Sequence, residues 1–202
     1  MTGEVIFGGR DLTIEEVYAL ATRKASARLS DNSDFRESIV RSAAHVAETL
    51  ARDGVIYGVT TGYGDSVTTP VPLDLVPELP LHLTRFHGVG MGRFLTPEET
   101  RAVMASRLAS LVRGWSGASF ELVELLCEML RLDILPLIPA EGSVGASGDL
   151  TPLSYVAGAL AGERRVLFKD REMMSAEAFA DAGLTPVVLR PQEALAVLND
   201  TA

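Results

Sequence analysis

The chain has 202 residues, 47% of them hydrophobic, which is enough to bury a substantial core in a single domain. Its 18 basic and 27 acidic residues give a net charge of −9, so a polyanion such as nucleic acid is repelled and a small molecule is the expected partner. One cysteine, Cys127, allows no internal disulfide. With three scattered histidines it lacks the spacing of a metal site, and we expect no metal.

The N-terminal residues show neither the basic start nor the apolar core of a signal peptide. No apolar run reaches the roughly 18 residues that a membrane-spanning helix requires. These two observations predict a cytoplasmic protein without a membrane partner. Because no internal repeat, charge block or flexible linker interrupts the chain, we expect residues 1–202 to form a single domain.

Helix signals dominate the pattern of hydrophobic and capping residues. Capping boxes over 13–16 and 96–99 mark two helix starts, and Gly54 and Gly183 mark two helix ends. In chain order the predicted elements are a strand over 4–7, helices starting at 14, over about 34–52, over 79–87, from 97 to about 114, over 119–132 and from 151 to 161, a β-hairpin over 165–174 and a helix over 175–182. The inward face of the helix over 34–52 is predicted to be Ile39, Ala43, Val46, Ala47 and Leu50. The fold class is therefore mainly α, a bundle-like helical core with a small β-hairpin.

Two segments lack helix signals and are rich in glycine, one over 55–70 and one over 142–149. Loops of this kind carry function more often than regular elements do. In Ala146-Ser147-Gly148 the amide nitrogen of Gly148 can reach the carbonyl carbon of Ala146, because small residues do not crowd either atom and glycine tolerates strained dihedral angles. Loss of water from Ser147 would then leave an electrophilic methylidene carbon on a five-membered ring.

The segment over 142–149 also has simpler interpretations. Its glycines lie three residues apart, which is not the dinucleotide-binding fingerprint, and no Lys-Ser or Lys-Thr follows as a P-loop requires. The sequence around Ser147 is not Gly-x-Ser-x-Gly, so a hydrolase elbow has no support. A glycine-rich turn with Asp149 as the N-cap of the next helix remains possible.

The run GSVGASGDLTPLS over 142–154, together with YGVTTGYG over 57–64, resembles the methylidene-imidazolone (MIO) ammonia-lyases and aminomutases that act on histidine, phenylalanine or tyrosine. The resemblance runs from near the N-terminus to the last residue. It implies an MIO cofactor (4-methylidene-imidazol-5-one) formed from Ala146, Ser147 and Gly148, with Asp149 assisting the cyclisation. Family members are usually more than twice as long, so this chain is expected to be the N-terminal portion of the ammonia-lyase fold, without the C-terminal helical half.

The resemblance also implies roles for residues elsewhere in the chain. Tyr57 matches the base that removes the β-proton of the substrate, and Gly64 matches a loop glycine near the MIO ring. Phe86 and His87 match the stretch that reads the far end of the substrate side chain. Asn199 matches an asparagine close to the ring and the substrate carboxylate.

Each of these residues has a purely structural alternative. Tyr57 can be a strand aromatic packed into the core, His87 the end of a capped helix, and Asn199 the cap of another helix. Two positions depart from the family pattern: His82 stands where an amide residue is more usual, and Asp200 stands where glycine usually follows the asparagine.

The implied function is an ammonia-lyase acting on an aromatic L-amino acid. Tyrosine is expected first, then histidine or phenylalanine, because His87 can hydrogen-bond a phenol hydroxyl that an apolar residue would leave unpaired. His87 also resembles the histidine-specific members, so this residue alone does not decide between tyrosine and histidine. The alternatives are an aromatic amino acid 2,3-aminomutase and a non-catalytic lyase-like subunit or scaffold. Family members form tetramers whose pockets borrow residues from several subunits. We therefore expect an oligomer, and a partner chain that supplies the C-terminal half is one form of it.

Overall fold

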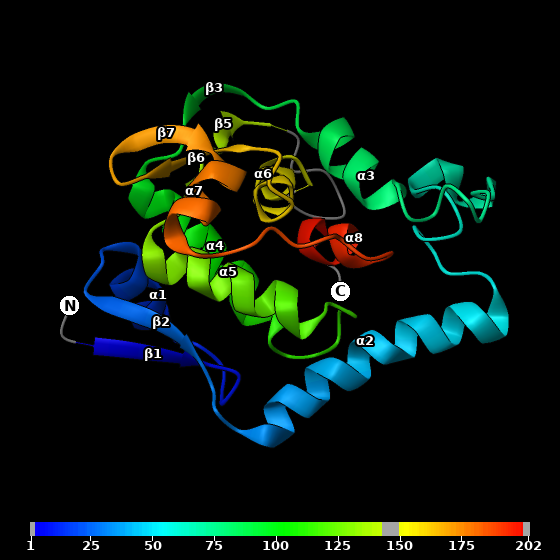
Figure 1. The fold of residues 1–202 in the computed structure, drawn as a ribbon, viewed down its shortest axis with the longest axis horizontal. Coiled ribbons are helices and arrows are strands. Elements are labelled where there is room, and N and C mark those ends of the chain that lie inside the picture. Colours follow the sequence, from blue (N-terminus) through cyan, green and yellow to red (C-terminus); the bar gives the residue numbers. More distant parts are fainter. Residues whose placement is uncertain (1–2, 143–149, 200–202) are drawn as a thin grey trace.

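The computed structural model describes residues 3–142 and 150–199 (Figure 1). The elements in chain order are β1 (Gly3–Phe7), α1 (Ile14–Ala21), β2 (Ala25–Leu29), α2 (Ser33–Asp53), a 3-10 helix η1 (Gly64–Thr68), α3 (Leu79–His87), β3 (Met91–Phe94), α4 (Pro97–Leu111), α5 (Phe120–Leu132), β4 (Leu135–Pro136), β5 (Pro139–Glu141), α6 (Leu150–Leu160), β6 (Arg165–Phe168), β7 (Arg171–Met174), α7 (Ser175–Ala182) and α8 (Glu193–Leu198). The fold is mainly helical with small sheets, which confirms the predicted class.

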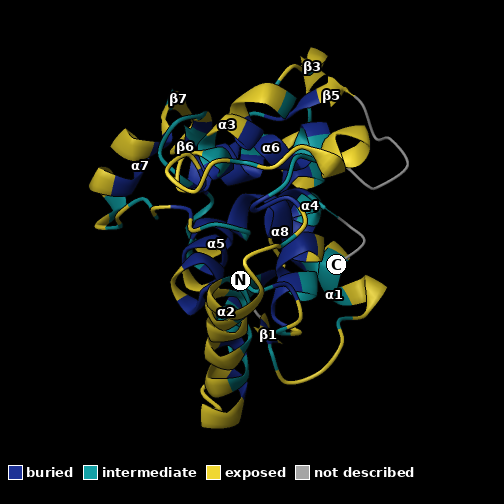
Figure 2. Cartoon of the chain, turned by 90° about the vertical axis from the view of Figure 1, so that its right-hand side faces the viewer, coloured by how far each residue is buried: buried dark blue, intermediate teal, exposed yellow. Residues whose placement is uncertain are grey.

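The hydrophobic core lies among α4, α5, α6 and α8, which are dark blue at the centre of Figure 2. Each of these helices contributes side chains with no more than 1% exposure. The largest on α4 and α5 are Met104, Leu108, Leu111, Leu122, Leu126 and Met129. The short helix α8 is buried over its whole length, because α3, α4 and α6 pack against it. Its Leu195 reaches the wall of the cavity described below.

The predicted helix starts are confirmed by their capping bonds. The Thr13 and Thr96 hydroxyls each accept the backbone N–H three residues on, and Glu16 and Glu99 complete the two capping boxes. The helix predicted to run to about 114 ends at Leu111. None of the helices in the described part of the chain is long and apolar enough to cross a membrane.

The hairpin of β6 and β7 is confirmed, with Arg165 opposite Met174 and Phe168 opposite Arg171. Its two turn residues have φ of +50° and +58°, the left-handed conformation that a two-residue hairpin turn needs. Strand β4 adds to the other edge of β6, and β3 pairs antiparallel with β5. Strands β3, β4 and β5 were not predicted from the sequence. Each has four residues or fewer and forms only by pairing with a strand elsewhere in the chain.

Strands β1 and β2 pair in parallel through the crossover helix α1, in register from Gly3 and Ala25 to Phe7 and Leu29. The strand over 4–7 was predicted, whereas β2 was not. Its sequence, ASARL, contains alanine, which is depleted in strands and gives a weak β signal. Ala25 and Ala27 face the core, where small side chains let β2 approach α5 closely.

Helix α2 begins and ends where predicted, and Gly54 follows it in the left-handed conformation. The burial of its inward face was predicted less well. Only Phe35 and Ile39 are buried on α2. Of the other predicted inward residues, Ala43, Val46 and Leu50 are half-buried and Ala47 is exposed. Figure 1 shows why: most of α2 extends away from the helical core, so the described residues cover only its N-terminal part.

Candidate functional site

A cavity of about 570 Å³ opens between α3, the loop over 57–66 and α8. The residues that line it are Tyr57, Gly62, Tyr63, Gly64, Ser66, Leu79, His82, Leu83, Phe86, His87, Leu150, Leu195 and Asn199. Every predicted site residue that the structure describes is in this set. Ala146, Ser147, Gly148 and Asp149 lie outside the described residues, as does Asp200. The candidate site is thus brought together from positions about 140 residues apart, near 57, 87 and 199.

Tyr57 stands in a turn, and its side chain is 48% exposed. Its hydroxyl oxygen accepts a hydrogen bond of 3.0 Å from the backbone N–H of Gly64. The structural alternative for Tyr57, a strand aromatic packed into the core, is therefore wrong. The ring meets Tyr63 edge-on, with centroids 6.4 Å apart, so two tyrosines stand together at the cavity wall.

The loop that carries Tyr57 is held by its own polar side chains and by one close approach. Thr60 Oγ1 accepts the Ile56 N–H at 2.8 Å, and Thr61 Oγ1 accepts the Gly58 N–H at 3.1 Å. Gly58 has φ of +68°, and a Cβ there would lie 2.7 Å from Leu195 of α8. Only glycine lets the loop pack this closely on α8.

Tyr63 is the more buried of the two tyrosines. Burial, and to a lesser degree the neighbouring Tyr57, raises the pKa of Tyr63 to about 12. The partly buried ring of Tyr63 packs against the hydrophobic core. The more exposed Tyr57 is kept as the candidate base that the sequence predicted.

His87 is the last residue of α3 and is half-buried. Its Nδ1 is buried and finds no hydrogen-bond partner among the described residues. Burial lowers the pKa of His87 below its ordinary value of 6.5, so the ring is neutral near pH 7. A neutral imidazole with an unpaired buried nitrogen is suited to hydrogen-bond a ligand in the cavity.

Two further side chains of α3 reach the cavity. The Phe86 ring lies 5.3 Å from the His87 ring, measured between centroids, and its side chain is 78% exposed. His82 Nε2 lies 3.8 Å from Glu78 Oε2 at the rim. His82, which departs from the family pattern, is thus an exposed rim residue with an acidic neighbour.

Asn199 occupies the C-cap position of α8, as its structural alternative expected, and at the same time lines the cavity. Its backbone carbonyl accepts a hydrogen bond of 3.0 Å from Nη1 of Arg107 on α4. Arg107 is 4% exposed. Sequence analysis missed this arginine, because a charged residue on an amphipathic helix is normally solvated and only the fold shows that this one is buried.

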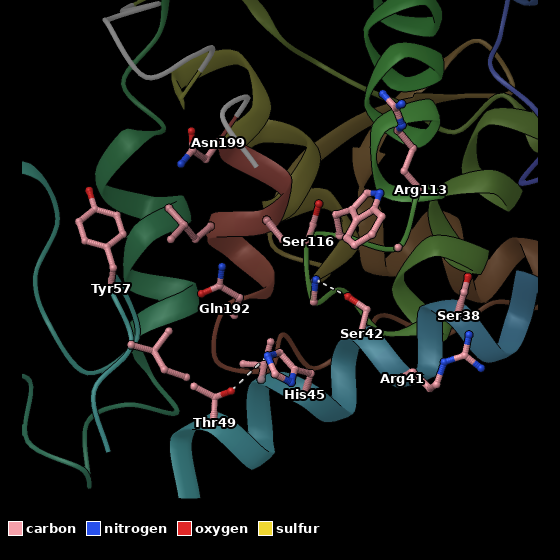
Figure 3. Close-up of a pocket in the computed structure, with 17 residues that line it drawn as sticks. Ser38, Arg41, Ser42, His45, Thr49, Tyr57, Arg113, Ser116, Gln192 and Asn199 are labelled. Atoms are coloured by element: carbon pink, nitrogen blue, oxygen red, sulfur yellow. Dashed lines mark hydrogen bonds between the residues drawn. The ribbon is translucent and has the colours of Figure 1, made fainter. Parts of the chain in front are cut away.

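A second cavity, of about 710 Å³, lies between α2, the loop over 113–117 and α8 (Figure 3). Its polar wall is drawn together by the Gly117 N–H, which donates to Ser42 Oγ at 3.1 Å. Tyr57 and Asn199 line both cavities. These two residues therefore form part of the wall between them.

The helical core and the cavity define a domain with the ammonia-lyase fold. Residues 12–202 match the model of the family described as aromatic amino acid lyase, and the chain belongs to this family. The predicted family resemblance is confirmed.

Three similar proteins illustrate the relationship. The probable histidine ammonia-lyase of Thermoplasma acidophilum is 37% identical over 194 residues, which cover 96% of this chain and 39% of that protein. The ergothioneine-degrading enzyme ergothionase of Treponema denticola superposes with a TM-score of 0.90 at 28% identity, over 97% of this chain and 39% of that one. The tyrosine aminomutase of Streptomyces globisporus superposes with a TM-score of 0.84 at 36% identity, over 96% of this chain and 36% of that one. The chain therefore spans less than two-fifths of the length of each of these three proteins.

Proposed function

We propose that this chain is the N-terminal part of an ammonia-lyase that eliminates ammonia from an aromatic L-amino acid. The observation that carries the proposal is that one cavity is lined by Tyr57, His87 and Asn199. The first side chain is suited to remove a proton, the second to hydrogen-bond the substrate ring and the third to bind a carboxylate. Family membership supports the same reaction class.

Histidine is the first substrate that we propose. His87 fits an imidazole as well as a phenol, because both rings offer a polar group that an unpaired nitrogen can hydrogen-bond. The curated relatives are named histidine ammonia-lyases. This order places histidine ahead of tyrosine, which was expected first from the sequence, and ahead of phenylalanine.

The proposed cofactor is an MIO group formed from Ala146, Ser147 and Gly148, with Asp149 supporting its formation. When formed, this group supplies an electrophilic carbon for the amine of the substrate. The described residues on either side fit such a group. Leu150, two residues after Gly148, lines the cavity, and a Cβ added at Gly142, four residues before Ala146, would lie 2.5 Å from Thr151 Cγ2. The start of α6 therefore lies beside both the cavity and the chain that leads toward Ala146.

The residues of the cavity have distinct proposed tasks. Tyr57 takes the β-proton, and the Gly64 N–H orients its oxygen and offers a donor to negative charge there. His87, neutral and half-buried, binds the polar end of the substrate ring, beside the exposed ring of Phe86. Asn199, held through its backbone by Arg107, binds the carboxylate.

A 2,3-aminomutase is the second candidate. It is favoured by one observation, the 36% identity to the tyrosine aminomutase of Streptomyces globisporus. The two reactions share their first half, the elimination of the amine. A lyase then releases the ammonia, whereas an aminomutase returns it to the β carbon before the product leaves. The outcome depends on how long the pocket stays closed. The remaining alternative is a non-catalytic lyase-like subunit.

We further propose that the active protein is an oligomer. The inward face of α2 is half-exposed beyond Ile39 in this chain, and a further polypeptide would cover it.

The test is to incubate the complete protein that contains this chain with histidine, tyrosine and phenylalanine separately. Release of ammonia with an α,β-unsaturated acid supports the lyase, with histidine expected to react fastest. A β-amino acid as the main product would identify an aminomutase. No product from any of the three, together with an intact mass that shows no loss of water from this chain, would support the non-catalytic alternative.

A further inference from the structure

The end of α3 is fastened to the end of α6 by side chains that belong to no predicted site. Arg164, in the turn between α6 and β6, donates from Nη2 to the backbone carbonyl of Thr84 at 3.1 Å. Thr84 is 1% exposed and lies one turn before His87. Arg164 therefore holds the main chain on the N-terminal side of His87.

Tyr155 on α6 holds the main chain on the other side of His87. Its hydroxyl oxygen accepts the Gly90 N–H at 3.1 Å. The Arg164 guanidinium lies over the Tyr155 ring, 4.8 Å from its centroid, so the two side chains form one unit. We call this unit, Tyr155 with Arg164, the α6 clamp.

The clamp is closely packed against the chain around His87. A Cβ added at Gly88 would lie 1.7 Å from Nη2 of Arg164. A Cβ added at Gly158 would lie 2.6 Å from Cγ of the same arginine. Glycine at these two positions is what leaves room for the arginine to reach Thr84.

A surface ion pair reinforces the same contact. Arg85, beside Thr84, pairs with Glu163 through two hydrogen bonds of 2.9 and 2.5 Å. Because both side chains are partly exposed, this pair contributes less than the buried contacts do.

Among the described residues, Nδ1 of the His87 ring finds no hydrogen-bond partner, so the position of the ring depends on the backbone that carries it. That backbone is fixed on both sides by the α6 clamp. Helix α6, which carries Tyr155, begins at Leu150, two residues after Gly148 of the proposed MIO group.

We infer that Tyr155 and Arg164 are positioning residues, which set the location of His87 relative to the start of α6 and thereby control which aromatic ring the cavity accepts. This inference rests on the proposed function. Neither side chain lines the cavity, so each acts on the choice of substrate only through the backbone of His87.

The test compares Tyr155→Phe and Arg164→Met in the complete protein. The first removes one hydroxyl and keeps the ring under the arginine; the second removes the guanidinium and keeps an apolar chain over Gly158. Each variant loses one hydrogen bond to the chain around His87, so we expect the ratio of kcat/KM for histidine to that for phenylalanine to fall about threefold to tenfold. The rise in KM for histidine should exceed the fall in kcat. Tyr18→Phe on α1, where the ring is 60% exposed, is the matched control and should leave the ratio unchanged.

Gly88→Ala supplies an independent variant. Its methyl group would displace the guanidinium, so it should lower the ratio as Arg164→Met does. In the Arg164→Met background the space is free, and adding Gly88→Ala should have little further effect. Additive losses in the double variant would contradict a shared mechanism.

If the wild type is active and the substrate ratio is unchanged in Tyr155→Phe, in Arg164→Met and in the control, the inference is overturned. The proposed function then stays intact. An inactive wild type would instead remove the proposed function. In that case amide hydrogen exchange over residues 84–92 decides: faster exchange in the two clamp variants than in Tyr18→Phe supports positioning of this segment, and equal exchange refutes it.

Discussion

The Tyr57 hydroxyl and the Gly64 backbone N–H are joined by a 3.0 Å hydrogen bond that closes the loop over 57–64 at the cavity wall. The oxygen that would act as a base is therefore held in place by the main chain. We expect Tyr57→Phe to lower kcat by about 10² to 10⁴, because a general base is lost. The Tm should change little, since the ring is half exposed. Tyr63→Phe, measured in the same assay, should retain most of the activity. Equal losses in both variants would argue against Tyr57 as the base.

Ser147→Ala removes the hydroxyl that must leave as water during ring formation. Deamination should be lost. The intact mass of the variant should equal the mass calculated from its substituted sequence, with no loss of water. A second measurement is the ultraviolet difference spectrum after a thiol is added. We expect the spectrum to change in the wild type and to stay the same in the variant. A variant that keeps the full rate would refute the ring mechanism.

His87→Leu should move substrate preference toward phenylalanine. The leucine offers no partner for an imidazole nitrogen or a phenol hydroxyl, and leaving such a group unpaired costs about 1–3 kcal/mol. The expected result is a fall in kcat/KM for histidine and tyrosine relative to phenylalanine of about tenfold or more. Unchanged ratios would exclude His87 as the residue that reads the ring.

The pH dependence of stability gives a separate test of His87. Burial holds its folded-state pKa below 6.5, so protonation favours the unfolded chain. Its contribution to stability is complete above pH 6.5 and is lost as the pH falls through the lower folded-state pKa. We expect the drop in Tm between pH 7 and pH 5 to be smaller in His87→Leu than in the wild type. Parallel curves would show that the ring is not desolvated in solution.

Glu193 provides a prediction about stability. It is 1% exposed, and its two oxygens accept the Ser119 N–H at 2.8 Å and the Arg190 N–H at 2.7 Å. Glu193→Leu leaves two backbone donors without this acceptor, at about 1–3 kcal/mol each. The free energy of unfolding, measured by urea titration, should fall by about 2–5 kcal/mol. Glu193→Gln, which keeps one oxygen acceptor, should lie between the leucine variant and the wild type.

Local signals account for what the sequence predicted well. The capping boxes at Thr13 and Thr96, the stop at Gly54 and the hairpin over 165–174 depend on neighbouring residues, and the structure confirms them. Strands β2, β3, β4 and β5 depend instead on partners far along the chain. The same distinction explains α2. Its periodicity predicted a helix, but the burial of the helix depends on which other parts of the chain pack against it.

The candidate site divides in a similar way. Tyr57, Gly64, His87 and Asn199 were found because their motifs resemble a known family, and the cavity brings them together. Arg107 and the α6 clamp gave no signal, because arginine and tyrosine are unremarkable in a sequence until their hydrogen-bond partners are known. Those partners are main-chain groups that nearly every residue type offers: the accepting carbonyls of Asn199 and Thr84 and the donating N–H of Gly90.

The hydrogen bond from buried Arg107 to the carbonyl of Asn199 has a consequence for folding. A guanidinium leaves water only when its surroundings are complete, so α8 and the asparagine dock on α4 in the same cooperative step that closes the interior. Recovery of ligand binding after dilution from denaturant should therefore keep pace with the global refolding signal, with no phase in which a formed core precedes a formed pocket.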